Sequence, residues 1–518
     1  MVHRVAKEAA VLVSKTEYES LLAIRGRQDE IIARNAELEK QVQWLMERMR
    51  LTRQKRFGSS SEKSEYDQLD FFNEAEATAD EEPVESETTK VREHSRKKPP
   101  QSREIMPQGL PEEIIEHTLP ENGRACPACG GDLYVMGKEE RRELKLIPAK
   151  AVSVRHIRYV YSCRCCEREG CDVPVLKAEM GEPVLKGSIA SPEAVAHIMA
   201  QKYVMGVPLY RQEQEYTRLG LGLTRQTMSN WVVKSAEQWL APVYEALKAR
   251  LVSGQVLHAD ETQLQVLHEE GKAAQSKSYM WMYRTSGDAS RAIVLYEYQP
   301  DRKKKRPEEF LKGFKGYLHA DGYSGYHDLP VEIKVVGCWA HARRKFDEAL
   351  KGLKPQDQEG SKALVGKRYC DRLFEIEREI RELSPEEKFK HRQERAMPLL
   401  DEFKQWMHIS AVAPKSLTGN AVGYVLGQWP YLRRYLEDGR LEISNNRAER
   451  SIKPFVIDRK NFLFANTARG ARASAVTFSL IETAKENNLN PCEYLANIFR
   501  RAPNLDLTDP EQINTLLP

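Results

Sequence analysis

The amino-acid sequence predicts a multidomain α/β protein whose central domain is a mixed sheet with flanking helices. At 518 residues, the chain is too long for one ordinary hydrophobic core. From residue 254 onward, strand-like runs alternate with helical segments, which is typical of a mixed sheet covered by helices. The preceding part carries a heptad repeat and a cluster of cysteines, which indicate further domains of other kinds.

Residues 15–57 are expected to form a zipper-like coiled coil. Apolar side chains recur every seven residues at Ile24, Ile31, Leu38 and Leu45. The interleaved set contains Asn35, and a polar residue at such a position can fix the register of paired helices. A single amphipathic helix packed on its own domain is the alternative. Because no glycine or proline lies between Gly26 and Gly58, self-association is favoured.

Residues 58–120 are expected to be a charged and largely disordered linker. The stretch Glu65–Thr89 holds ten acidic residues and no basic one, so the net charge of +4 hides a more basic remainder. That imbalance favours a polyanionic partner. No run of 18 apolar residues exists and the N-terminus is a poor signal peptide, so we expect a cytoplasmic protein without a membrane partner.

Residues 121–180 are expected to form a zinc-binding module. Six of the nine cysteines lie between residues 126 and 171, and such clustering favours metal binding over disulfides in a cytoplasmic chain. The turn Cys126-Pro127-Ala128-Cys129 would supply two thiolates of a structural, tetrahedral zinc site. The second pair is chosen from Cys163, Cys165, Cys166 and Cys171, and spacing alone does not make that choice unique. Free buried thiols are the alternative.

Residues 185–250 are expected to be helical and similar to a helix-turn-helix DNA-binding region. Thr224 is a candidate N-cap after a glycine-rich turn. The side chains expected on the exposed side of the following helix, where they could contact bases or phosphates, are Arg225, Gln226, Ser229 and Asn230. Any capped helix with polar residues would have a similar pattern, so a purely structural helix stays open.

Three carboxylates follow in segments 251–350 and 441–476, which we expect to form one core. Asp260 and Asp321 each end a strand-like run, where a polar side chain has no packing reason to be. Glu449 lies in a polar helical stretch that Pro454 is expected to end or kink. Carboxylate oxygens suit magnesium, and two such ions about 3.5–4 Å apart support phosphodiester chemistry. This order of residues predicts a ribonuclease-H-like catalytic core.

Structural roles for the same residues are the alternative. Asp321 could cap a turn with Gly322, and Glu449 could pair with Lys453 one helical turn on. Glu261 is the less suitable neighbour of Asp260, because successive side chains of a strand point to opposite faces.

Other residues near the carboxylates are expected to support the site or to contact DNA phosphates. Cys338 and His341 lie just past a strand and would support the site, or they are a buried cysteine and a satisfied histidine. The candidate phosphate contacts are Arg343, Arg344, Lys345, Arg450 and Lys453, with a solvated charged face or internal pairing as the alternative. Residues 351–440 are expected to be a helical insertion, and residues 477–518 a C-terminal helical tail.

The combination of motifs resembles the insertion-sequence-66 transposases, which are bacterial enzymes of the Asp-Asp-Glu class. The resemblance rests on the zipper-like start, the segment Arg56-Phe57-Gly58-Ser59-Ser60-Ser61, the cysteine cluster, the C-terminal tail and three carboxylate motifs. Those motifs are His258-Ala259-Asp260-Glu261-Thr262, His319-Ala320-Asp321-Gly322-Tyr323 and Asn445-Asn446-Arg447-Ala448-Glu449-Arg450. Cys338-Trp339-Ala340-His341 is similar to a Cys-x-x-His signature of several related transposase groups.

The resemblance implies a transposase that binds terminal inverted repeats, cleaves 3′ ends and transfers them to target DNA. Asp260, Asp321 and Glu449 would ligate two Mg²⁺ ions, or Mn²⁺ in vitro, and Cys163 and Cys166 would complete the zinc site. It further implies accessory proteins of the same element and a nucleoid-associated protein of the bacterial cytoplasm. Two other functions stay open: a non-catalytic zinc-containing DNA-binding regulator, and a ribonuclease-H-like structure-selective nuclease.

Overall fold

The computed structural model describes residues 14–57, 150–162, 168 and 175–518, with the side chains of 53–57, 162 and 175 left out. The chain divides into two units, one comprising residues 1–61 and 180–518 and the other residues 62–179. In the second unit, β1 (Val160–Ser162) pairs with β2 (Val175–Lys177) in antiparallel fashion. The six clustered cysteines, and with them the expected zinc ligands, lie outside the described residues.

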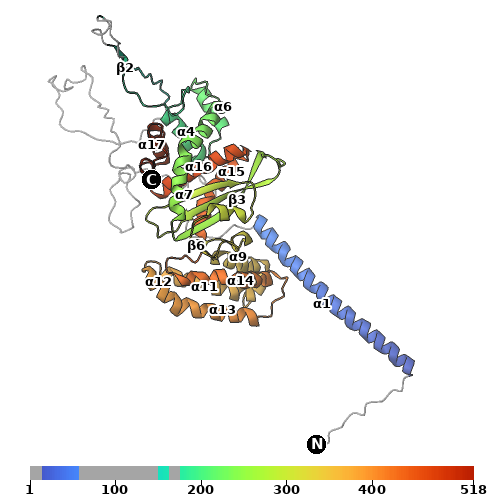
Figure 1. Ribbon diagram of the computed structural model, residues 1–518. Helices are drawn as coiled ribbons and strands as arrows, with labels where there is room; N and C mark the ends of the chain where they lie inside the picture. Colours follow the sequence, from blue (N-terminus) through green and yellow to red (C-terminus); the bar gives the residue numbers. More distant parts are fainter. Residues whose placement is uncertain (1–13, 58–149, 163–167, 169–174) are drawn as a thin grey trace, which may run out of the picture. The chain divides into compact units, whose positions relative to one another are not determined.

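The first unit is built on a mixed sheet, as the sequence predicts (Figure 1). Its strands are β3 (Val256–His268), β4 (Lys277–Thr285), β5 (Val294–Gln299), β6 (Gly316–His319), β7 (Ile333–Val336) and β8 (Ala465–Thr467). The order is β5-β4-β3-β6-β7, and β8 pairs with the far end of β3. Strand β4 is antiparallel to both of its neighbours, β3 and β5, whereas β6 and β7 continue the sheet parallel to β3.

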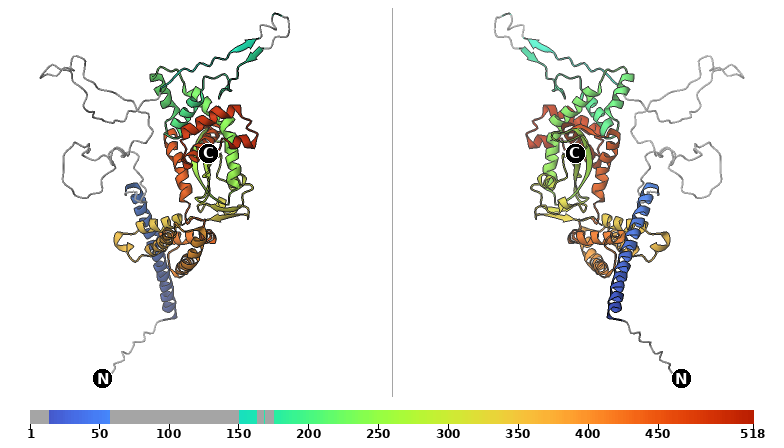
Figure 2. Two further views of the ribbon diagram at one scale, coloured as in Figure 1. Left: turned by 90° about the vertical axis from the view of Figure 1, so that its left-hand side faces the viewer. Right: turned by 90° about the vertical axis from the view of Figure 1, so that its right-hand side faces the viewer.

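Helices cover both faces of this sheet, as the left-hand view of Figure 2 shows. These helices are α7 (Ala241–Val252), α8 (Lys305–Phe310), α15 (Asn446–Phe462) and α16 (Ala468–Glu486). On one face, Tyr296 of β5 packs against Phe455 of α15 and Phe478 of α16. On the other face, Tyr283 of β4 stacks on Phe310 of α8 with ring centroids 3.8 Å apart. We call the first of these the α15 face.

Helices that precede or follow the sheet strands in the sequence complete the main core. They are α4 (Pro192–Tyr203), α5 (Leu209–Arg218), α6 (Arg225–Ser235), α17 (Pro491–Arg501) and α18 (Pro510–Asn514), with a π-helical turn at Ala236–Leu240. The expected N-cap of α6 is confirmed, because Thr224 Oγ1 accepts a hydrogen bond from the Thr227 N–H at 3.2 Å. The expected boundary between residues 476 and 477 falls inside α16, which buries Phe478 in the same core.

Residues 339–437 form a second group of helices with an apolar core of its own. These helices are α9 (Trp339–Gly352), α10 (Pro355–Gln358), α11 (Lys362–Glu379), α12 (Pro385–His391), α13 (Met397–Ile409) and α14 (Leu417–Leu432), with a π-helical segment at Arg392–Ala396 and a 3₁₀ segment at Arg433–Glu437. Trp339, Phe346 and Phe403 pack at their centre. Because α9 directly follows β7, this group starts next to the ends of the parallel strands.

Helix α1 (Lys15–Phe57) contacts the second helical group through its C-terminal half, where residues between Asn35 and Arg50 line one pocket with Leu353, Lys354 and Asp357. There, Arg50 Nη1 donates to the Gly352 carbonyl at 3.3 Å, and Leu51 is buried. The heptad residues Ile24, Ile31 and Leu38 are about half exposed or more. Within the described residues, none of the helices is both long enough and apolar enough to cross a membrane.

Candidate functional site

Asp260 does not end its strand as expected, because β3 continues to His268, but it lies just past the last residue of β3 that pairs with β6, and Asp321 follows the end of β6. The register of β3 and β6 places His258 directly beside His319. Each aspartate follows two residues later, so it shares the sheet face of its histidine. After the last residue of β6, the chain is still hydrogen-bonded to β7, because the Ala320 N–H donates to the Val336 carbonyl at 3.1 Å. The two carboxylates are therefore neighbours at the edge where β3 and β6 end their pairing.

Glu449 reaches this edge from the first turn of α15. Its Oε1 lies 3.7 Å from His341 Nε2, and its Oε2 lies 3.6 Å from Arg344 Nη2. Both partners belong to the start of α9, so these ion pairs connect α15 to α9 instead of joining Glu449 to Lys453. Pro454 does not end the helix, which continues to Phe462. Its ring removes one N–H, so the carbonyl of Arg450 lacks its usual helical donor.

The pKa of Asp260 shows that negative charge converges at this point. Burial raises the pKa of the Asp260 carboxyl well above its usual value, and the charges of Glu261, Asp321 and Glu449 raise it further. A hydrogen bond from the Glu261 N–H at 2.8 Å opposes the shift. Because like charges in one site cannot all ionise without compensation, the site favours either a proton or a bound cation.

Glu261 belongs to the opposite face of the sheet from Asp260. Its side chain, 2% exposed, accepts hydrogen bonds from Arg302 Nε at 2.7 Å and from the Tyr326 hydroxyl at 2.6 Å. Burial raises the pKa of Glu261, and the Arg302 charge opposes that rise. An internal ion pair therefore occupies this carboxylate. Asp321 does have the turn role noted above, since its Oδ1 accepts from the Tyr323 N–H at 2.9 Å, and its second oxygen remains for other partners.

A stacked pair of buried histidines lies directly beneath the two aspartates. The rings of His258 and His319 are fully buried, with centroids 4.4 Å apart and planes within 11° of parallel. Burial lowers the pKa of His258 to about 3, and it lowers the pKa of His319 well below its usual value. The pair is therefore neutral. Sequence reasoning did not assign these residues, although the triplet His-Ala-Asp occurs at both aspartates.

Asn445 is a third residue that sequence reasoning did not assign. Its Nδ2 donates to the Ala259 carbonyl at 2.8 Å, and its Oδ1 accepts from His258 Nδ1 at 3.0 Å. Its backbone N–H donates to Cys338 Sγ at 3.2 Å, and its carbonyl accepts from the Glu449 N–H. Asparagine is a preferred N-cap, yet here its side chain does not cap α15. It connects the Asp260 strand to the Glu449 helix.

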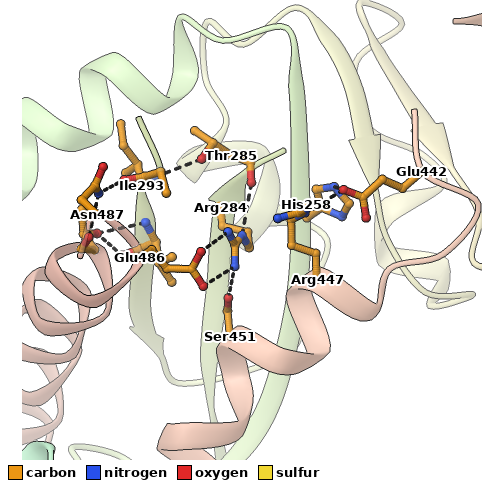
Figure 3. A network of polar contacts seen from close by, with 12 residues as sticks. His258, Arg284, Thr285, Ile293, Glu442, Arg447, Ser451, Glu486 and Asn487 are labelled. Carbon is orange, nitrogen blue, oxygen red and sulfur yellow. Dashed lines mark hydrogen bonds and ion pairs between the residues drawn. The ribbon is translucent and has the colours of Figure 1, made fainter. Parts of the chain in front are cut away.

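Further polar contacts fix α15 on the sheet (Figure 3). Arg284 of β4 is 2% exposed and forms a two-pronged ion pair with Glu486, at 3.0 and 2.9 Å, while also donating to Ser451 Oγ of α15. Nearer the aspartates, Arg447 Nε donates to Glu442 Oε1 at 2.7 Å, and that oxygen lies 4.0 Å from His258 Nε2.

Cys338 and His341 lie against Glu449. Cys338 is buried at the N-cap position of α9, and His341 is one turn along that helix. One ligand atom from each of Cys338, His341 and Glu449 lies within 4.8 Å of the other two. The structure therefore brings the Cys-x-x-His pair to the third carboxylate.

The candidate DNA contacts fall into two groups. On α6, Arg225, Gln226 and Asn230 are exposed and Ser229 is half-buried, while Arg225 also forms an ion pair with Glu213 at 3.8 Å. The second group lies on α9 and α15. There, Arg343 pairs with Asp371, Arg344 pairs with Glu449, Lys345 lies over the Tyr424 ring, and Arg450 and Lys453 are exposed.

Four family models match this chain, and their matches follow one another along the sequence between residues 44 and 518. They are described as transposase IS66 family (residues 187–473), zinc-finger binding domain of transposase IS66 (124–167), Transposase C of IS166 homeodomain (44–115) and IS66 C-terminal element (479–518). The first match contains β3, β6 and α15 with all three carboxylates. The second contains Cys126, Cys129, Cys163, Cys165 and Cys166, whereas Cys171 lies beyond it.

Curated relatives occur in Sinorhizobium fredii (strain NBRC 101917 / NGR234). The uncharacterized protein y4jD is 32% identical over 432 residues, which are 80% of this chain and 81% of the relative. The uncharacterized protein y4qI is 29% identical over 522 residues, covering 96% of this chain and 91% of the relative. The chain is a transposase-class protein with DNA-binding and zinc-finger regions. It belongs to the IS66 transposase family.

Proposed function

We propose that this chain is an Asp-Asp-Glu transposase that cleaves the 3′ ends of its element and joins them to target DNA. Asp260, Asp321 and Glu449 are the catalytic residues of this proposal, on a ribonuclease-H-like core. The observation that carries it is their convergence from β3, β6 and α15, with the charges of Asp321 and Glu449 raising the pKa of Asp260.

The donor set fits hard divalent cations. All three groups offer carboxylate oxygens, the ligands that Mg²⁺ prefers, and their mutual repulsion is relieved when a cation binds. When bound, two such ions would activate the attacking oxygen and stabilise the leaving oxygen of a phosphodiester displacement. The chain's own part is to hold the carboxylates in place. The neutral His258–His319 pair adds no positive charge that would repel a cation bound at Asp260.

Basic residues on α9 and α15 are placed to receive the DNA backbone. Arg450 and Lys453 are exposed on the helix that carries Glu449, and Lys345 is exposed on α9. Because phosphate contacts position DNA without reading sequence, these side chains suit the scissile region. In this proposal, the zinc module and the exposed side of α6 recognise the terminal repeats. The ligands of the zinc are Cys126, Cys129, Cys163 and Cys166.

Self-association through α1 would bring two element ends together. The heptad positions Ile24, Ile31 and Leu38 expose apolar surface that a second copy of the helix would cover. Accessory proteins of the same element are also part of the proposal, and only the family membership supports them.

The test is cleavage and strand transfer on a labelled element-end duplex with Mg²⁺. We expect Asp260→Asn, Asp321→Asn and Glu449→Gln each to reduce both steps about 100-fold or more, because a metal ion contributes several kcal/mol to transition-state stabilisation. DNA affinity should persist, since each change removes a negative charge. Asp288→Asn, an exposed aspartate on the turn after β4, is the matched control and should behave as wild type.

Three outcomes would contradict the proposal. If any of the three variants cleaves DNA at the wild-type rate, the residue substituted in that variant is not catalytic. An active protein that cuts branched DNA without strand transfer is the structure-selective nuclease. A protein that binds element ends and stays inactive with Mg²⁺ or Mn²⁺, even with the accessory proteins of its element added, is the regulator.

A further inference from the structure

Cys338, His341 and Glu449 form a cluster with mixed ligand chemistry beside the two aspartates. Their ligand atoms lie within 4.8 Å of one another, and they come from the N-cap position of α9, the first turn of α9 and the first turn of α15. Sulfur and imidazole nitrogen are poor ligands for Mg²⁺ but good ones for Zn²⁺ and similar ions. The cluster therefore differs in kind from the three-carboxylate set.

Two atoms of this cluster lack hydrogen bonds although they are buried. Nδ1 of His341 and Oε1 of Glu449 have no hydrogen-bond partner among the described residues. Buried polar atoms of this kind are normally paired, and a bound cation would give Glu449 Oε1 a partner. The separation between His341 Nε2 and Glu449 Oε1 is 3.7 Å, which is too long for a hydrogen bond.

That separation does suit two ligands of one ion. Tetrahedral zinc with bonds of about 2.0–2.3 Å places its ligand atoms roughly 3.3–3.7 Å apart. The remaining distances of up to 4.8 Å would close by small side-chain rotations. Cys338 Sγ accepts the Asn445 N–H at 3.2 Å, and such a contact orients a thiolate ligand without occupying its metal-binding side.

We propose that Cys338, His341 and Glu449 bind one thiophilic divalent cation of the Zn²⁺ class. The site has three protein ligands and an open fourth position. It holds Glu449 through Oε1, the oxygen nearer His341, and leaves Oε2 beside Arg344. The ion thereby fixes the side chain that reaches the magnesium site, and it is separate from the zinc of the family's zinc-finger domain.

The test is the zinc content of the full chain after exhaustive dialysis against zinc-free buffer. Wild type should retain one zinc more than Cys338→Ser and His341→Gln, and Glu449→Gln should lower the affinity for that zinc at least about 100-fold. His341 is 25% exposed in its side chain, so its replacement is the variant least expected to disturb folding. Cys370→Ser is the matched control, because Cys370 is an equally buried free thiol away from this cluster.

Cobalt(II) supplies a second readout that does not depend on DNA cleavage. After Co²⁺ replaces zinc, the spectrum of wild type minus that of Cys338→Ser should show thiolate-to-cobalt charge transfer, and excess Mg²⁺ should not remove it. Asp260→Asn should keep both the extra zinc and this spectrum, even though it stops cleavage under the proposed function.

Several results would overturn the assignment. Equal zinc content in wild type, Cys338→Ser and His341→Gln means that no ion is held here. Equal loss from all variants on dialysis means adventitious zinc only. Loss of the extra zinc in Asp260→Asn but not in Cys338→Ser places it among the carboxylates instead, and that result would leave the proposed transposase activity untouched.

Discussion

Replacing Asn445 by alanine should damage both the stability of the protein and the placement of Glu449. The residue is 1% exposed, and its side chain makes two buried hydrogen bonds across 186 and 187 sequence positions. Alanine would leave the Ala259 carbonyl and His258 Nδ1 without partners. Each buried unsatisfied group costs about 1–3 kcal/mol, so the loss is roughly 2–6 kcal/mol. That is a large part of the 5–15 kcal/mol that typically stabilises a domain.

Asn446→Ala is the matched control. Asn446 is the neighbouring residue of the same type, but it is exposed. Its replacement should change the free energy of unfolding by no more than about 0.5 kcal/mol. Chemical denaturation of both variants measures this difference, and single-turnover cleavage at a temperature where both are folded measures the effect on the site.

Cleavage by Asn445→Ala should fall about 100-fold, because a displacement near 1 Å of a catalytic group is worth that much. Element-end affinity should remain at the wild-type level. The reasoning is refuted if Asn445→Ala is as stable as Asn446→Ala. It is also refuted if the folded Asn445→Ala variant cleaves DNA at the wild-type rate, since Asn445 would then not position Glu449.

Two further predictions concern α16 and α1. Burial alone would raise the pKa of Glu486, but the hydrogen bonds and charge of Arg284 hold it below its usual value. A depressed carboxyl pKa stabilises the fold above the unfolded-state pKa, and this contribution is lost as the pH falls through the folded-state value. Glu486→Gln should therefore be less stable than wild type at pH 7, by about 1–3 kcal/mol after allowance for partial exposure, and the difference should shrink in acid as the pH falls through the depressed pKa of Glu486. On α1, Leu38→Lys should shift the protein toward monomers, and light scattering measures this change in mass. Ala36→Lys is the control, because Ala36 lies outside the heptad positions, and it should not change the mass. Equal masses for the two variants would argue against the zipper.

The sequence predicts those parts of the structure that depend on local pattern. The mixed sheet follows from strand-like runs between helical segments, and the cap at Thr224 follows from residue type alone. The proximity of Asp260 and Asp321 could be anticipated because each follows an apolar strand-like run, although β3 continues past Asp260 to His268. Of the two outcomes expected for Pro454, an end of the helix is wrong, because α15 continues through Pro454 to Phe462.

Contacts between distant segments could not be predicted in the same way. Asn445 stands in a quoted motif, and its type indicates an N-cap, yet its partners are set by tertiary packing. The stacking of His258 on His319 needs the strand register, which a single sequence does not give. Likewise, the contact of His341 with Glu449 requires that α9 and α15 meet after an insertion of about 90 residues.

The three carboxylates are held by two different physical means. Backbone hydrogen bonds of β3 and β6 align Asp260 with Asp321, so that pair depends little on side chains elsewhere. Glu449 lies on a helix outside the ladder, and α15 reaches the sheet only after a long helical insertion. The side chains of Asn445 and Ser451 connect this helix to β3 and β4, and beyond its C-terminal end β8 pairs with β3. Asn445 and Ser451 therefore contribute to the position of the third carboxylate, as strand pairing does for the first two. Substitutions at these anchors should impair catalysis more than binding, since they move one ligand and leave the DNA-contacting surface intact.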